Sequence, residues 1–202
     1  IELSGNLLIE DEVSLRSGTI LKVATGGILS AVSRVNLDAP YVSVGMAFEP
    51  PLNPQSDAEK FRNETAVFGN VLKSEYYAPP VWGEGKVIVN ASRAVDLGNM
   101  SFQRVGSVQI TTPGVIRGNG TVAVAGDMTM QAAQIETVSD TSFRSIAFDY
   151  AKADGSVVES STAGPLSPGV ARGSITILAN GNALKPLSAG GSLSLYAREL
   201  TI

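Results

Sequence analysis

The carboxylates are the groups in this sequence that could support catalysis, because the chain has no histidine and no cysteine. Their absence excludes disulfides, zinc or iron sites built on these residues, and reactions that need an imidazole base or a thiolate nucleophile. A glycosidase instead needs two carboxylates that face each other across a groove. The local acidic run of Glu10, Asp11 and Glu12 falls at a predicted turn, and we interpret it as a solvated corner.

Four further carboxylates fall at predicted strand ends or turns, where aspartate binds backbone groups. They are Asp96, Asp127, Asp149 and Asp154. A polysaccharide lyase would place acidic calcium ligands near a catalytic arginine or lysine, and Arg93 with Asp96 supplies only one such pair. The calcium-binding nonapeptide of some β-helices is absent from the sequence. The sequence therefore predicts no catalytic, cofactor or metal site, and a protein that is not an enzyme.

The densest aromatic group is formed by Tyr76, Tyr77 and Trp82, in a chain with a single tryptophan. Aromatic faces on a surface could stack on the pyranose ring of a sugar. The same residues could instead pin their segment onto the rest of the protein, and the sequence leaves both interpretations open. They are the only residues for which we predict contact with a ligand or partner.

The charge balance and the apolar patterning exclude two classes of partner. Lys and Arg number 15 and Asp and Glu number 19, which gives a net charge of −4. This balance argues against a nucleic-acid partner, because such binding depends on cationic contacts to phosphate. The longest apolar runs, such as Val87–Val89, are far shorter than the roughly 20 residues of a membrane-spanning helix, so we expect no membrane insertion. With 44% apolar and 17% charged residues, the chain can bury a core.

A weak repeat positions these candidate residues on short strands. Each unit is a glycine followed by apolar residues two positions apart, as in Gly85 with Val87 and Val89. Units start at Gly85, Gly106, Gly120, Gly173 and Gly191, with intervals such as 21 residues from Gly85 to Gly106. Period-two patterning with β-branched residues indicates strands, and repeats of this size indicate a solenoid. We predict an all-β fold, a single parallel β-helix over residues 1–202, with a β-sandwich as the alternative.

Two segments interrupt the repeat. The first, from about 46 to 83, is rich in proline, and Ser56 with Glu59 forms a capping box that predicts a short helix over about 57–68. The second, from about 137 to 168, contains alternating apolar residues around Ile146 and a turn signal at Asp154–Gly155. It is predicted to be a β-hairpin that protrudes from one coil of the stack.

The repeats resemble those of the filamentous-haemagglutinin-type large exoproteins, which bacteria export by two-partner secretion. The resemblance rests on residues 37–42, 85–98, 120–130 and 186–195, and it covers most of the chain outside the two interruptions. It implies a right-handed parallel β-helix shaft that is secreted or held at the bacterial cell surface. It also implies an outer-membrane secretion partner for the full-length protein.

The expected function is therefore a non-enzymatic shaft segment of a secreted adhesin, which mediates attachment or presents a distal tip. Its expected partner is a host or bacterial cell-surface receptor or glycan. The alternative is a carbohydrate-active or carbohydrate-binding β-helix domain, such as a polysaccharide lyase or a tailspike. A stalk that delivers a contact-dependent toxin would share the same fold.

Overall fold

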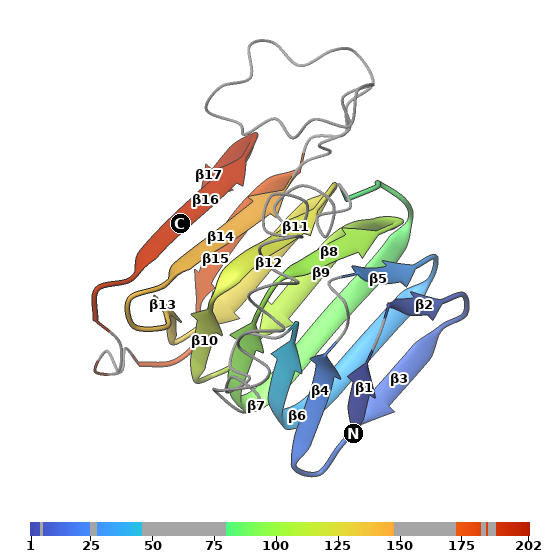
Figure 1. Ribbon diagram of the computed structural model, residues 1–202, viewed down its shortest axis with the longest axis horizontal. Helices are drawn as coiled ribbons and strands as arrows, with labels where there is room; N and C mark the ends of the chain where they lie inside the picture. Colours follow the sequence, from blue (N-terminus) through green and yellow to red (C-terminus); the bar gives the residue numbers. More distant parts are fainter. Residues whose placement is uncertain (5, 25–27, 46–79, 148–172, 183–184, 186–188) are drawn as a thin grey trace, which may run out of the picture.

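The protein is built from parallel strands in two sheets (Figure 1). The computed structural model describes all residues except 5, 25–27, 46–79, 148–172, 183–184 and 186–188. Within the described residues every strand pairing is parallel, and no helix occurs. The prediction of an all-β fold with parallel strands is confirmed. The β-sandwich alternative is wrong, because such sandwiches consist of antiparallel sheets.

The smaller sheet, which we call sheet B, has six strands. In spatial order they are β2 (Leu7–Ile9), β5 (Ile28–Ala31), β8 (Met100–Gln103), β11 (Gly120–Val124), β14 (Ser142–Ala147) and β16 (Ser192–Ala197). Their sequence order equals their spatial order. We therefore call one pass the stretch of chain from one strand of sheet B to the next. The edges of sheet B are therefore its first strand, β2, and its last strand, β16.

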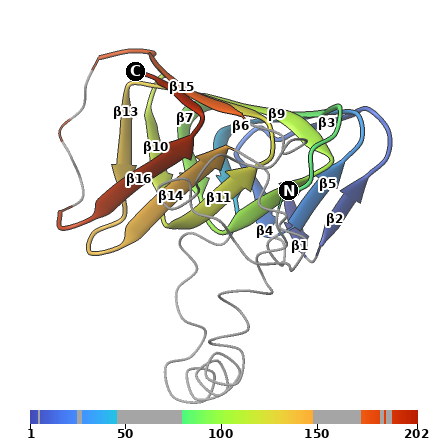
Figure 2. The same cartoon turned by 90° about the horizontal axis from the view of Figure 1, so that it is seen from above.

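The larger sheet, sheet A, has eleven strands arranged in two rows. The first row holds β3 (Val13–Arg16), the start of β6 (Arg34–Val44), the start of β7 (Gly85–Leu97), β9 (Val105–Thr111), β12 (Asp127–Ala132), β15 (Ser174–Ala179) and β17 (Glu199–Thr201). The second row holds β1 (Glu2–Ser4), β4 (Ile20–Ala24), the ends of β6 and β7, β10 (Val115–Gly118) and β13 (Gln134–Thr137). In Figure 2, strands β9 and β15 of the first row lie on the opposite side of the molecule from β11, β14 and β16 of sheet B, and β10 and β13 of the second row run between these two sides.

The core consists of apolar columns that run perpendicular to the strands, because equivalent residues of successive passes are in register. One column of the first row contains Val13, Val35, Val87, Val108, Met128, Ile175 and Leu200. Its members from Val35 to Ile175 are at most 1% exposed. Met128 and Met130 are both fully buried in these columns.

Part of the predicted second interruption belongs to sheet B. Ser142–Ala147 was assigned to a protruding hairpin, but it forms β14 and pairs in parallel with β11 and β16. The period-two pattern around Ile146 is the same in a hairpin and in a coil of the stack, which explains the error. The remainder of the predicted hairpin lies outside the described residues. So do the predicted helix over 57–68 and nearly all of the first interruption.

Four glycines, Gly85, Gly106, Gly126 and Gly173, share a corner where the backbone of one pass closely approaches the next. A Cβ atom added to Gly126 would lie 1.9 Å from the carbonyl oxygen of Gly106, and one added to Gly173 would lie 1.7 Å from that of Gly126. At Gly85 the corresponding distance, to the carbonyl oxygen of Ala31, is 2.0 Å. Glycine is needed at this corner because a Cβ atom has no space, and not because the turn requires a positive φ.

The close backbone packing at this corner predicts that two glycine substitutions differ strongly in their effect on the free energy of unfolding. Gly126→Ala forces a Cβ into the neighbouring backbone, so we expect it to lower the free energy of unfolding by about 2–3 kcal/mol. Gly18→Ala serves as the control, because nothing lies within 4 Å of its Cβ position, and the expected change is within about 0.5 kcal/mol. Urea unfolding followed by circular dichroism measures both. Equal stabilities of the two variants would contradict the close-packed corner.

Candidate functional site

The outer face of the second row of sheet A carries a column of polar residues, one on each strand. This polar column comprises Glu2, Lys22, Ser43, Asp96, Arg117 and Glu136. The residues face outward because they alternate with inward apolar residues such as Val95 and Leu97. Opposite charges meet on neighbouring strands, where Glu2 is paired with Lys22 and Arg117 lies between Asp96 and Glu136. Such cross-strand pairs stabilise the register of a sheet.

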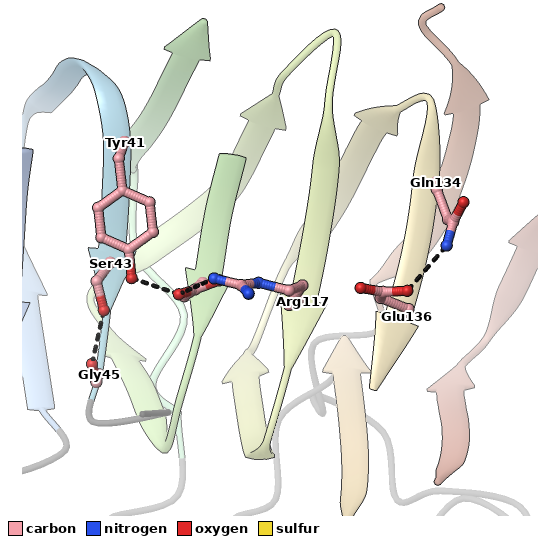
Figure 3. A network of polar contacts seen from close by, with 7 residues as sticks. Tyr41, Ser43, Gly45, Arg117, Gln134 and Glu136 are labelled. Atoms are coloured by element: carbon pink, nitrogen blue, oxygen red, sulfur yellow. Dashed lines mark hydrogen bonds and ion pairs between the residues drawn. The ribbon is translucent and has the colours of Figure 1, made fainter. Parts of the chain in front are cut away.

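Asp96 is the centre of this column and is only 1% exposed. Arg117 donates two hydrogen bonds to it, from Nε to Oδ1 at 2.8 Å and from Nη2 to Oδ2 at 2.8 Å. The hydroxyl of Tyr41 donates a third to Oδ2 (Figure 3). A buried carboxylate is stable only with partners of this kind. The network joins β6, β7 and β10 through their side chains.

The neighbouring strand continues the network. Glu136 on β13 is 8% exposed, and its Oε2 accepts a hydrogen bond of 2.8 Å from Nε2 of Gln134 (Figure 3). On the other side, the hydroxyl of Ser43 donates to the carbonyl oxygen of Gly45 at 3.3 Å. Partial burial alone would lower the pKa of Arg117. The hydrogen bonds to Asp96 and its negative charge raise this pKa, and the charges of Tyr41 and Glu136 raise it further. The guanidinium is therefore held in its charged form.

The arrangement is better suited to holding strands than to catalysis. Asp96 and Glu136 are two strands apart, which corresponds to about 9.6 Å and falls near the separation of the carboxylates of an inverting glycosidase. Both side chains are buried, however, and both oxygens of Asp96 already accept hydrogen bonds. A catalytic carboxylate must reach the substrate or a water molecule. Here the two oxygens of Asp96 face protein donors instead.

The predicted ligand-contact residues are only partly described. Tyr76 and Tyr77 lie outside the described residues. Trp82 is 52% exposed, and its Nε1 lies 3.4 Å from the position that a Cβ atom of Gly106 would occupy. One part of the indole therefore packs on the glycine corner, while the rest faces solvent.

The acidic residues predicted from the sequence differ in their roles. Glu10, Asp11 and Glu12 are exposed. Asp127 does bind a backbone group, since its Oδ1 accepts hydrogen bonds of 2.8 and 2.9 Å from the N–H and the hydroxyl of Ser174. The expectation for Asp96 was wrong, because its carboxylate binds the side chains of Arg117 and Tyr41 rather than a turn.

Sequence reasoning missed Tyr41, Arg117 and Glu136. Asp96 was compared with Arg93, which is near in sequence and exposed, whereas its true partner is on the next strand of the row. A signal was present, because Asp96 and Arg117 are 21 residues apart, like Gly85 and Gly106. Applying this spacing to polar residues would have placed the two charges side by side.

Comparisons of the chain with protein-family models, with curated proteins and with solved structures found no match. The resemblance of its repeats to those of large exoproteins therefore stays a prediction. Among the described residues, no helix has the length and apolar character needed to cross a membrane. The same residues contain no group of three or more acidic side chains that could hold a metal ion.

The polar network predicts unequal costs for removing two aspartates. Asp96→Ala leaves the half-buried Arg117 without its main partner, so we expect a loss of about 3 kcal/mol in the free energy of unfolding. Asp38→Ala removes an ion pair with Arg16 in which both side chains are more than half exposed, and the expected loss is below about 0.5 kcal/mol. Urea unfolding measures both. A loss for Asp96→Ala as small as that of Asp38→Ala would show that the network contributes little.

The raised pKa of Tyr41 predicts that the folded protein loses stability at alkaline pH. Burial of the phenol, with the hydrogen bond and the negative charge of Asp96, raises its pKa to about 12 from the usual 10.0. The folded state then binds the proton more tightly than the unfolded state, so this contribution is complete below pH 10 and is lost between pH 10 and 12. The expected observation is a decrease in unfolding free energy over this window that is smaller in Tyr41→Phe. Identical slopes in both proteins would contradict it.

Proposed function

We propose that this chain is a non-enzymatic shaft segment of a secreted bacterial exoprotein of the adhesin type. In this proposal the two parallel sheets are the faces of a right-handed parallel β-helix. The observation that carries it is the continuity of the columns, since the column that starts at Val13 meets an equivalent residue on every strand of its row up to Leu200. A stack in which every pass repeats the last is suited to spanning distance.

The polar column supports the same proposal. Its central carboxylate, Asp96, binds both Arg117 and Tyr41 across neighbouring strands. Such groups strengthen the stack along its axis and offer no free carboxylate at the centre of the column. In the full-length protein the shaft would hold a distal tip away from the cell, where a surface receptor or glycan is the partner. An outer-membrane transporter would export the chain.

The second candidate is a carbohydrate-active or carbohydrate-binding domain. Two observations favour it: the half-exposed indole of Trp82, and the presence of Asp96 and Glu136 on one outer face. An exposed indole could stack on a sugar ring. The burial and the hydrogen bonds of the two carboxylates argue against hydrolysis, so this candidate is weaker as an enzyme than as a binding module.

A shaft must tolerate the removal of one complete pass. Because Lys86 is in register with Ser107, deletion of residues 85–105 joins Glu84 to Gly106 and puts Ser107 in the place of Lys86. We expect this variant to keep a β-type circular dichroism spectrum and cooperative unfolding. When introduced into the full-length protein, it should still be exported and labelled by antibodies on intact cells.

The matched control deletes residues 85–95, which joins Glu84 to Asp96 and puts inward residues out of register with their columns. We expect this variant to lose cooperative unfolding and export. Loss of folding in both variants would overturn the shaft proposal. So would cleavage of any member of a panel of acidic polysaccharides by the unmodified chain, which would favour the carbohydrate-active candidate.

A further inference from the structure

The pass from β5 to β8 differs from the others, because it crosses both rows of sheet A twice, first as β6 and then as β7. In sheet B, β5 nevertheless pairs directly with β8, with Ile28 in register with Ser101. The core beneath these two strands is filled, since Leu29 is fully buried and Phe102 is 1% exposed. The chain that connects β6 to β7 therefore cannot run between β5 and β8 or through the core beneath them.

The described residues that flank 46–79 lie at opposite ends of β8. Gly45 lies beside the residue that precedes β8, because a Cβ atom added to it would be 2.7 Å from the carbonyl oxygen of Asn99. Val81 lies beside the residue that follows β8, and its carbonyl oxygen accepts a hydrogen bond of 2.7 Å from the N–H of Arg104. The chain thus leaves sheet A at one end of β8 and returns at the other.

The outer face of sheet B carries a column of mostly apolar residues that are in register on neighbouring strands. This outer column comprises Ile28, Ser101, Ala123, Ile146 and Tyr196. Its members point away from the core, because they alternate with inward residues along each strand. Ala123 and Ile146 form a cluster of their own, separate from the main core, and Tyr196 packs against it.

The centre of the outer column is buried although it faces outward. Ser101 is 1%, Ala123 0% and Ile146 6% exposed. Leu8, which points the same way from β2, is 58% exposed. The outward side chains of a sheet are solvated unless a further layer covers that face. The burial therefore indicates a cover over β8, β11 and β14.

We propose that residues 46–79 cross the outer face of sheet B and dock on the outer column. The segment is far longer than the four residues of β8 that it must pass. The helix predicted over about 57–68 would place Phe61 and Phe68 two turns apart on one face, which supplies the apolar groups that this surface needs. The small side chains of Ser101 and Ala123 allow a close approach to the sheet.

The other long segment outside the described residues, 148–172, accounts for the cover less well. It follows Ala147 and precedes Gly173, and the N–H of Gly173 donates a hydrogen bond of 3.0 Å to the carbonyl oxygen of Ala147. Both ends of this segment thus lie at one corner of the stack, and nothing requires it to cross the sheet. The strand order favours 46–79 as the occupant.

The docking follows from the strand order and does not rest on the shaft function, so either proposal can fail without the other. Because the chain has no cysteine, a single introduced thiol reports on the cover. Ser101→Cys puts a thiol into the outer column with little change in size. Ser14→Cys is the matched control, because Ser14 is exposed on the outer side of β3. In the folded chain, a maleimide reagent should modify the Ser101→Cys thiol at least about 100-fold more slowly than the control thiol.

Substitutions in the segment then test the occupant. Phe61→Asp with Phe68→Asp would bury charges on the outer column, so the Ser101→Cys thiol should react more than about tenfold faster. Val157→Asp with Val158→Asp makes the same change in 148–172 and should leave the rate unchanged. Circular dichroism checks that the strands stay folded. Phe61→Ser with Phe68→Ser replaces the aspartate pair if the latter prevents folding.

Two results would overturn the proposal. The first is a Ser101→Cys thiol that reacts as fast as the Ser14→Cys thiol in the folded chain, which would show that nothing covers the outer column. The second is a protected thiol whose reaction rate is insensitive to the substitutions at Phe61 and Phe68. That result would assign the cover to another part of the chain, such as 148–172, or to a second copy.

Discussion

The structure depends on one constraint: every pass of the chain must lie in parallel register on the pass before it. Neighbouring strands are about 4.8 Å apart, so each residue contacts its equivalent in the next pass more closely than almost any other side chain. The apolar columns follow directly, as in the series from Val35 to Ile175 that is buried throughout. The requirement for glycine at the corner also follows, because the backbones of successive passes leave no space for a Cβ atom at Gly126 or Gly173.

The same constraint explains why the protein carries a buried charge on its outer face. A column of like charges would repel along its whole length, whereas alternating charges attract. Asp96, Arg117 and Glu136 alternate on three neighbouring strands, and Tyr41 adds a hydrogen bond from an adjacent strand. The network connects neighbouring strands of the second row on their outer face, whereas the apolar contacts connect them only on their inner face. This role accounts for buried carboxylates without invoking a reaction.

A stack of this kind also has functional consequences that do not depend on a binding pocket. Contacts are made only between neighbouring passes, so length can change without rebuilding the rest of the protein.

The sequence by itself determined the local structure, because strand and turn preferences depend on neighbouring residues. The period-two pattern around Val87 and the glycine before it were sufficient to predict short parallel strands. The hairpin assigned around Ile146 failed because one strand looks the same in a hairpin and in a coil. Only the tertiary structure decided which side chains meet across the stack, since the contact between Asp96 and Arg117 depends on register over 21 residues. Register is a property of the whole column, and no single segment of the chain specifies it.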